Sequence, residues 1–221
     1  TFNPALLGFY LVATLISFGL VWAWSTRRIT REDRGVYVQG AFRGNCGIVG
    51  LALAANLYGD YGLSAGGLLL GLVIVVYNTL SVVVLLAYHP EKSMNFASTA
   101  RDIARNPLIL AVIVALPVAA SGLTLPGWVM TSGDYFASLT LPLALLCIGA
   151  TISLKSLRSD SGPALGSSLW KMVLLPVGCT FAAWLAGFEG RELGLMFLFF
   201  ASPTAAASFV MVKALGGNDK L

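Results

Sequence analysis

The sequence predicts an all-α integral membrane protein, and three observations lead to that class. Hydrophobic residues make up 57% of the 221 residues and charged residues only 11%, with a mean hydropathy of +0.81. An ordinary soluble domain is about 25% charged. The apolar residues also form runs of roughly 20, the length that a helix needs to cross a ~30 Å hydrocarbon core. These runs are too long and too uniform for the alternating strands of a barrel.

The first three spans are expected at 5–24, 40–58 and 63–87. The first run is uniformly apolar, which is sufficient for a spanning helix. Glycines and polar residues interrupt the second. The third carries a polar patch midway, which either lines a pathway or bonds local carbonyls and a neighbouring helix: Asn78, Thr79 and Ser81.

The remaining four spans are expected at 106–122, 135–154, 166–186 and 193–213. Pro107 suits the first position of the fourth helix, where its missing N–H has no helical partner. Pro142 is expected to kink the fifth helix. Lys171 lies early in the sixth, and its long side chain is expected to reach back to the cytoplasmic surface.

Basic residues set the orientation. Lys and Arg gather in loops 25–39, 88–105 and 155–165 and in the C-terminal tail, whereas the intervening turns hold only Arg191. Because short cytoplasmic loops are rich in Lys and Arg, residue 1 is expected outside and residue 221 in the cytoplasm. The net charge of +4 is spread over these loops, so it is an orientation signal and does not indicate nucleic-acid binding.

An internal repeat predicts the domain organisation. Residues 43–63 align with residues 201–221 at a constant offset of 158, and the two segments run through the membrane in opposite directions, as an inverted repeat requires. Residues 1–87 then hold three helices of the first repeat and residues 106–221 four helices of the second, joined by a cytoplasmic linker at 88–105. The register predicts two more helices before residue 1 and one after residue 221, ten in all as five plus five.

Two of the expected helices contain sequence that is ill suited to lipid. The stretch FRGNCGIVGLALAANLYG, residues 42–59, holds an arginine, two asparagines and four glycines, and its repeat partner FASPTAAASFV, residues 200–210, holds a proline among hydroxyl groups. Such residues are tolerated where a helix is interrupted and lines a cavity. Two broken helices at corresponding places are the best sequence pointer to the substrate site of a transporter. Their half-helix N-termini would offer N–H groups to an anion.

The candidate site residues come from these two stretches. We predict that the substrate is bound by Arg43, Asn45, Gly47, Ser202, Pro203, Thr204 and Ser208. We predict that the helices are interrupted by Gly44, Gly50 and Pro203. Arg43 either pairs with a substrate carboxylate through its planar fork or extends to the cytoplasmic interface, and both interpretations stay open.

Neither enzyme chemistry nor a metal site is expected. His89 is the only histidine, and the three cysteines lie within expected spans without metal-ligand spacing: Cys46, Cys147 and Cys179. Each cysteine is expected to act as a small buried hydrophobe. No cofactor is expected, and the coupling ion, H+ or Na+, stays open because the expected spans contain no central Asp or Glu.

Four motifs resemble the bacterial branch of the auxin efflux carrier family, which is related in fold to the bile acid sodium symporters. They are FRGNCGIVGLALAANLYG, RNPLILAVIVALP, LTLPLALLCIGATISL and SPTAAASFVMVKALGG. The resemblance implies an inverted-repeat fold of five plus five helices, of which about seven are present, with broken helices crossing at spans 40–58 and 193–213. It places Asn45 on the first crossing and Pro203 with Thr204 on the second. The family's usual GLPL reads GLAL here, with Ala52 in place of the proline, so nearby glycines are expected to supply the flexibility.

The resemblance implies a secondary active transporter that moves small organic anions across the bacterial inner membrane by alternating access. The expected substrates are mono- or dicarboxylates, auxin-like or malonate-like. The alternative is a membrane receptor or an assembly subunit without transport. The expected partners are the organic anion and membrane lipid, without nucleic acid, and a homodimer stays open as the oligomeric state.

Overall fold

A computed structural model describes residues 3–89, 101, 107–151 and 161–214. Within these ranges the chain is helical, and its β structure is an isolated bridge between Gly44 and Thr204. The helices are α1 (Pro4–Arg28), α2 (Arg31–Phe42), η1 (Cys46–Gly50), α3 (Leu51–Ala87), α5 (Pro107–Ala120), α6 (Gly127–Thr151), α8 (Ser161–Leu169), η2 (Trp170–Leu174), α9 (Leu175–Leu185), α10 (Gly190–Ala201) and α11 (Ala206–Ala214). The segments η1 and η2 are single π-helical turns that continue directly into α3 and α9.

The prediction of an all-α membrane protein is confirmed. Three helical segments of the described chain are long and apolar enough to cross a membrane: Pro4–Arg28, Cys46–Ala87 and Gly162–Leu185. Large apolar side chains lie on the outer surface, as on α1 and α9, where Leu20 and Phe181 are each 58% exposed. Such a surface is costly in water and is favourable against lipid tails.

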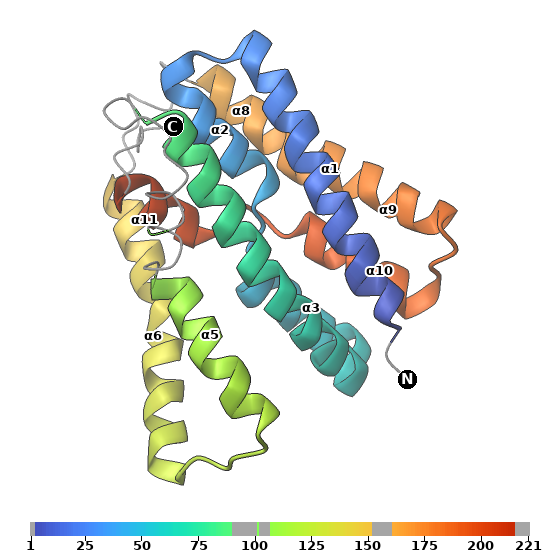
Figure 1. The fold of residues 1–221 in the computed structure, drawn as a ribbon, viewed down its shortest axis with the longest axis vertical. Helices are drawn as coiled ribbons and strands as arrows, with labels where there is room; N and C mark the ends of the chain where they lie inside the picture. The colour runs from blue at the N-terminus through green and yellow to red at the C-terminus, as the bar shows by residue number, and fades with distance from the viewer. Residues whose placement is uncertain (1–2, 90–100, 102–106, 152–160, 215–221) are drawn as a thin grey trace.

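The helices form two groups of unequal size (Figure 1). The larger group contains α1, α2, α3 and α8 to α10, and α5 and α6 extend from it as a hairpin. In the hairpin, α5 packs on α3 and α6 packs on α11. The core of the larger group lies where the interrupted helices meet. There Tyr10 of α1 stacks on Phe200 at 4.2 Å between ring centroids, and its hydroxyl lies 2.8 Å from that of Tyr77.

The expected loop 25–39 is largely helical, which corrects the sequence-based boundary. Helix α1 continues to Arg28 and α2 begins at Arg31, so the connection is very short. The polar composition of this segment hid the helix, yet Glu32 and Asp33 lie in the first turn of α2, where negative charge is favourable. Likewise, the fifth helix begins at Gly127, earlier than expected. The expected linker 88–105 lies almost entirely outside the described residues.

The expected spans 40–58 and 63–87 meet in a sharp turn at Gly59. Its torsion angles, φ 55° and ψ −136°, are accessible to glycine and strained for other residues. The turn brings the backbone of Gly62 against that of Ala54, so a Cβ built at Gly62 would clash with the Ala54 carbonyl oxygen. Glycine at 59 supplies the conformation, and glycine at 62 supplies the space.

Both predicted interruptions are present. The first leaves residues 43–45 outside the helices, between α2 and η1, and the second leaves residues 202–205 outside, between α10 and α11. With the offset of 158, the last residue of α2, Phe42, corresponds to Phe200, one residue before α10 ends at Ala201. The interruptions therefore fall at equivalent places of the sequence repeat.

The contact at Gly62 predicts the effect of one added methyl group. Gly62→Ala should destabilise the protein by about 1–3 kcal/mol, because the clash is with backbone that cannot rotate away. Gly67→Ala is the matched control on the same helix, since a Cβ there meets no atom within 4 Å. The midpoint of thermal unfolding of the complete protein in detergent measures both. Equal midpoints for the two variants would contradict the tight turn.

Candidate functional site

The two interruptions meet and pair with each other. The Asn45 N–H donates to the Pro203 carbonyl at 2.7 Å, and the Ala205 N–H donates to the Arg43 carbonyl at 3.2 Å. Gly44 and Thr204 lie between these bonds as an antiparallel bridge. Each broken helix thus satisfies backbone groups that the other has lost, and we call this contact the crossing.

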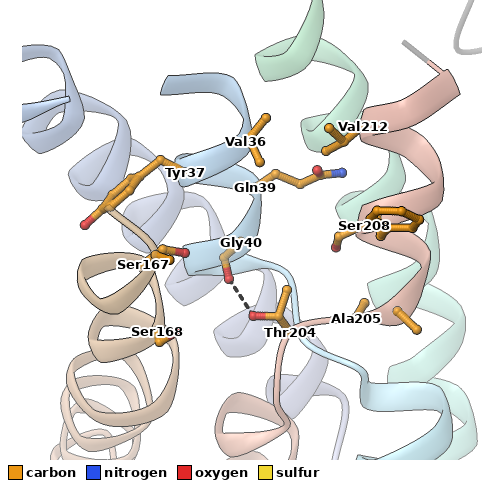
Figure 2. Close-up of a pocket in the computed structure, with 13 residues that line it drawn as sticks. Val36, Tyr37, Gln39, Gly40, Ser167, Ser168, Thr204, Ala205, Ser208 and Val212 are labelled. Atoms are coloured by element: carbon orange, nitrogen blue, oxygen red, sulfur yellow. Dashed lines mark hydrogen bonds between the residues drawn. The ribbon is translucent and has the colours of Figure 1, made fainter. Parts of the chain in front are cut away.

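Two helices end at the crossing, and side chains cover their last carbonyls. The final four carbonyls of a helix have no helical partner. On α2, the Thr204 hydroxyl donates to the Gly40 carbonyl at 2.9 Å (Figure 2). On α10, three side chains donate to successive carbonyls: Ser202 Oγ to Leu198 at 2.8 Å, Cys46 Sγ to Phe199 at 3.3 Å, and Lys171 Nζ to Phe200 at 2.8 Å.

The structure contradicts the expectation that Lys171 reaches the cytoplasmic surface. Its side chain is fully buried, with 0% of its surface exposed. A Cβ on Gly44 would lie 2.9 Å from its Nζ atom, so the ammonium fits against the crossing because residue 44 is glycine. The Phe200 carbonyl, freed by the break in the neighbouring helix, provides an interior acceptor that the linear sequence does not reveal.

Arg43 is also buried, with 4% of its surface exposed. Its Nη2 atom donates to Asn78 Oδ1 at 2.9 Å, and its Nη1 atom donates to Ser81 Oγ at 3.4 Å and to the sulfur of Met211. The alternative in which Arg43 extends to the interface is therefore wrong. These partners are neutral, and the described part of the chain gives the guanidinium no ion pair. Asn78 and Ser81, two of the three residues in the polar patch of the third span, orient the Arg43 guanidinium.

A cavity of about 320 Å³ lies beside this guanidinium, and we call it the Arg43 cavity. Its wall includes the start of η1, with Gly47, and the residues around the start of α11, with Ala205 and Ala207. Asn45 and Asn78 add polar groups. Two helix N-termini, each with a positive dipole end, therefore border the same space as a buried cation.

A second cavity of about 320 Å³ lies between α2, α8 and α11 (Figure 2), and we call it the Ser208 cavity. Gln39 extends from α2 toward α11, on which Ser208 lies. Both side chains are buried, and Gln39 Oε1 and Ser208 Oγ have no hydrogen-bond partner among the described residues. Tyr37, Ser167, Ser168 and Thr204 add further polar groups to its wall.

The structure gathers the predicted site residues around the crossing but divides them between its sides. Arg43, Asn45 and Gly47 line the Arg43 cavity together with Gly44, whereas Thr204 and Ser208 line the Ser208 cavity. Pro203 lies in the crossing itself. Ser202 is buried, and its hydroxyl bonds the Leu198 carbonyl.

Gly50 requires a correction. It was predicted to interrupt the helix, but its torsion angles, φ −61° and ψ −51°, are helical. A Cβ at this position would lie 2.8 Å from Ser202 Oγ and 3.4 Å from the Phe199 ring. Glycine is needed here for the close approach of α10, and the interruption lies earlier, at residues 43–45.

Sequence reasoning missed Lys171 and Cys46 as parts of the crossing. A lysine inside an apolar run was the available signal, since an intramembrane charge is a functional-site hypothesis by default. The neutral appearance of Cys46 gave no such signal. Both residues act on carbonyls of α10, more than 25 residues further along the chain, as the spacings of 29 and 153 residues show.

The apolar helices and two broken helices that cross around a buried cation define a membrane transporter. A profile of the family described as "Membrane transport protein" matches residues 93–220, more than half of the chain. The chain therefore belongs to this family, the auxin efflux carrier family that its motifs resemble. An uncharacterized transporter of Methanocaldococcus jannaschii is 21% identical over 193 residues, which cover 83% of this chain and 60% of that relative.

The bond between Thr204 and Gly40 predicts a difference between two conservative changes. Thr204→Val should lower the free energy of unfolding by about 1 kcal/mol, because a freed carbonyl of α2 loses its donor. Thr204→Ser keeps the hydroxyl and should retain most of the wild-type stability. Thermal unfolding of the complete protein in detergent distinguishes the two variants. The bond has no energetic role if valine and serine unfold at the same temperature.

Proposed function

We propose that this protein is a secondary carrier that moves small organic anions, mono- or dicarboxylates, across the bacterial inner membrane. The anion binds in the Arg43 cavity at the crossing of the two broken helices. One observation carries this proposal: a buried guanidinium held by neutral groups borders a cavity that two helix N-termini also border.

Charge balance supports an anionic substrate. A buried charge without a counter-charge is expensive, and more so within a membrane. Asn78 and Ser81 orient the Arg43 guanidinium but do not neutralise it. A bound carboxylate would provide the missing charge, accept two parallel hydrogen bonds from the guanidinium, and meet the positive dipole ends of η1 and α11.

The dimensions of the cavity support a small substrate. A volume of about 320 Å³ lies at the lower end of the 300–1,000 Å³ typical of ligand pockets. Gly47 has no side chain to cover the backbone at the start of η1, which leaves its N–H groups accessible to a carboxylate. Leu70 and Val73 provide apolar contacts for the carbon skeleton.

The position of the cavity supports alternating access. Ala111 of α5 contributes to its wall, so the substrate would lie between the crossing and the α5–α6 hairpin. The crossing belongs to the larger group of helices, from which the hairpin extends (Figure 1). A rocking motion of one group against the other would open the same cavity first to one side of the membrane and then to the other.

Removal of the Arg43 charge tests the proposal. Arg43→Met should lower kcat/KM for uptake by roughly 100-fold or more, because a buried counter-charge is lost. Arg43→Lys should have a kcat/KM between those of the wild type and Arg43→Met, since an ammonium keeps the charge without the bidentate fork. The assay is saturable uptake of labelled dicarboxylates and indole acids into proteoliposomes that contain the complete protein.

Arg191→Met is the matched control. This cation lies over the Tyr61 ring, 4.0 Å from its centroid, and does not line the Arg43 cavity. The uptake rate of Arg191→Met should equal that of the wild type. Full uptake by Arg43→Met would disprove the site, and failure of the wild type to take up any acid would favour a receptor or an assembly subunit.

A second variant neutralises Arg43 without removing it. Asn78→Asp places a carboxylate where Oδ1 now accepts from the guanidinium at 2.9 Å, so an internal ion pair should replace the substrate and abolish uptake. Asn56→Asp makes the same change at an exposed position of α3 and should retain uptake. Uptake by Asn78→Asp at the wild-type rate would show that the Arg43 charge does not attract the anion.

A further inference from the structure

We propose that Lys171 is a built-in cation of the crossing, whose ammonium takes the place that a small monovalent cation would otherwise occupy at the end of α10. Anion uptake then needs no free cation at this position. Only the uptake readout rests on the proposed carrier function, because binding of a cation in place of the ammonium can be measured without transport.

The end of α10 is a natural cation site. A helix C-terminus carries a negative dipole end and carbonyls without helical partners. Ser202 and Cys46 donate to two of these carbonyls, and Lys171 Nζ donates to the Phe200 carbonyl at 2.8 Å. The ammonium is the charged member of this set, so it offsets the dipole as well as satisfying a carbonyl.

Burial of Lys171 indicates a purpose beyond packing. The side chain has 0% of its surface exposed, and the described residues provide it with no carboxylate. The groups around the ammonium are the Phe200 carbonyl, the backbone of Gly44 and the thiols of Cys46 and Cys179. The Cys46 thiol itself donates to the Phe199 carbonyl. A methionine would fill the same space at a lower desolvation cost, so the charge is what the site requires.

Two backbone features hold the ammonium in place. Lys171 lies within the π-helical turn η2, a rare geometry that often marks functional sites. On the opposite side, Gly44 leaves room for the ammonium, because a Cβ there would approach Nζ to 2.9 Å and Cε to 3.2 Å. Gly44 follows Arg43 directly in the chain. The Arg43 side chain therefore lines the proposed anion site, and the backbone of the next residue lies against the Lys171 ammonium.

The first experiment measures cation binding without transport. Lys171→Ala should create a small cavity that exposes the Phe200 carbonyl, and methylammonium should raise the midpoint of thermal unfolding of this variant in detergent. Choline at the same concentration is the control, since it is too large for the space and has no N–H group to donate. The wild type and Lys171→Met should respond to the two salts equally, because the site is filled in both.

The second experiment measures uptake in proteoliposomes. Wild-type uptake should be the same in sodium and choline buffers, and Lys171→Ala should be roughly tenfold slower or worse, because a positive charge at the crossing is lost. Methylammonium should restore part of its rate. Lys171→Met keeps the apolar volume and should fold. Its uptake should nevertheless be as slow as that of Lys171→Ala, and methylammonium should not restore it.

Several results would overturn the proposal. Equal effects of methylammonium and choline on Lys171→Ala would show that no cation site exists, and wild-type uptake by Lys171→Met would show that the charge is not needed. If Lys171→Ala does not fold, uptake by Lys171→Met alone decides whether the charge is needed. If the wild type takes up no anion, the proposed function fails, while the unfolding measurements still decide whether Lys171 occupies a cation site.

Discussion

The structure depends on the pairing of two interrupted helices. In lipid, a backbone N–H or carbonyl without a partner costs several kcal/mol, so a broken helix survives only where other groups replace the lost bonds. Here each interruption supplies them to the other, through the bonds from Asn45 to Pro203 and from Ala205 to Arg43. Side chains of η1, η2 and the second interruption then donate to carbonyls at the ends of α2 and α10. The crossing is therefore stable and polar at the same time.

The ends of four half-helices give the crossing its electrostatic character. Two C-termini, those of α2 and α10, meet two N-termini, those of η1 and α11. Lys171 lies at a negative end, and the Arg43 cavity opens at the positive ends. In our proposals the first is filled by the chain's own ammonium and the second by a substrate anion. In these proposals, the crossing lies between the Lys171 ammonium, which is part of the chain, and the anion that is transported.

Close packing sets where the crossing can form. Gly44 admits the Lys171 ammonium, and Gly50 admits Ser202 and the Phe199 ring. Because a methyl group at either position would meet an atom within 3.0 Å, the helices have little freedom to slide at these contacts. The α5–α6 hairpin meets the larger helix group through the packing of α5 on α3. The alternating-access proposal places movement at that boundary and keeps the crossing rigid.

The sequence by itself determined the membrane class and the places where two helices break, because hydropathy, glycine and proline act over a few residues. It also placed Arg43 and Asn45 at the first break. Only the tertiary structure decided that Arg43 is held by Asn78 and that Lys171 turns inward to Phe200. Gly50 likewise proved to serve packing. These outcomes depend on partners from other helices, up to 168 residues away for Arg43 and Met211, and no local pattern specifies them.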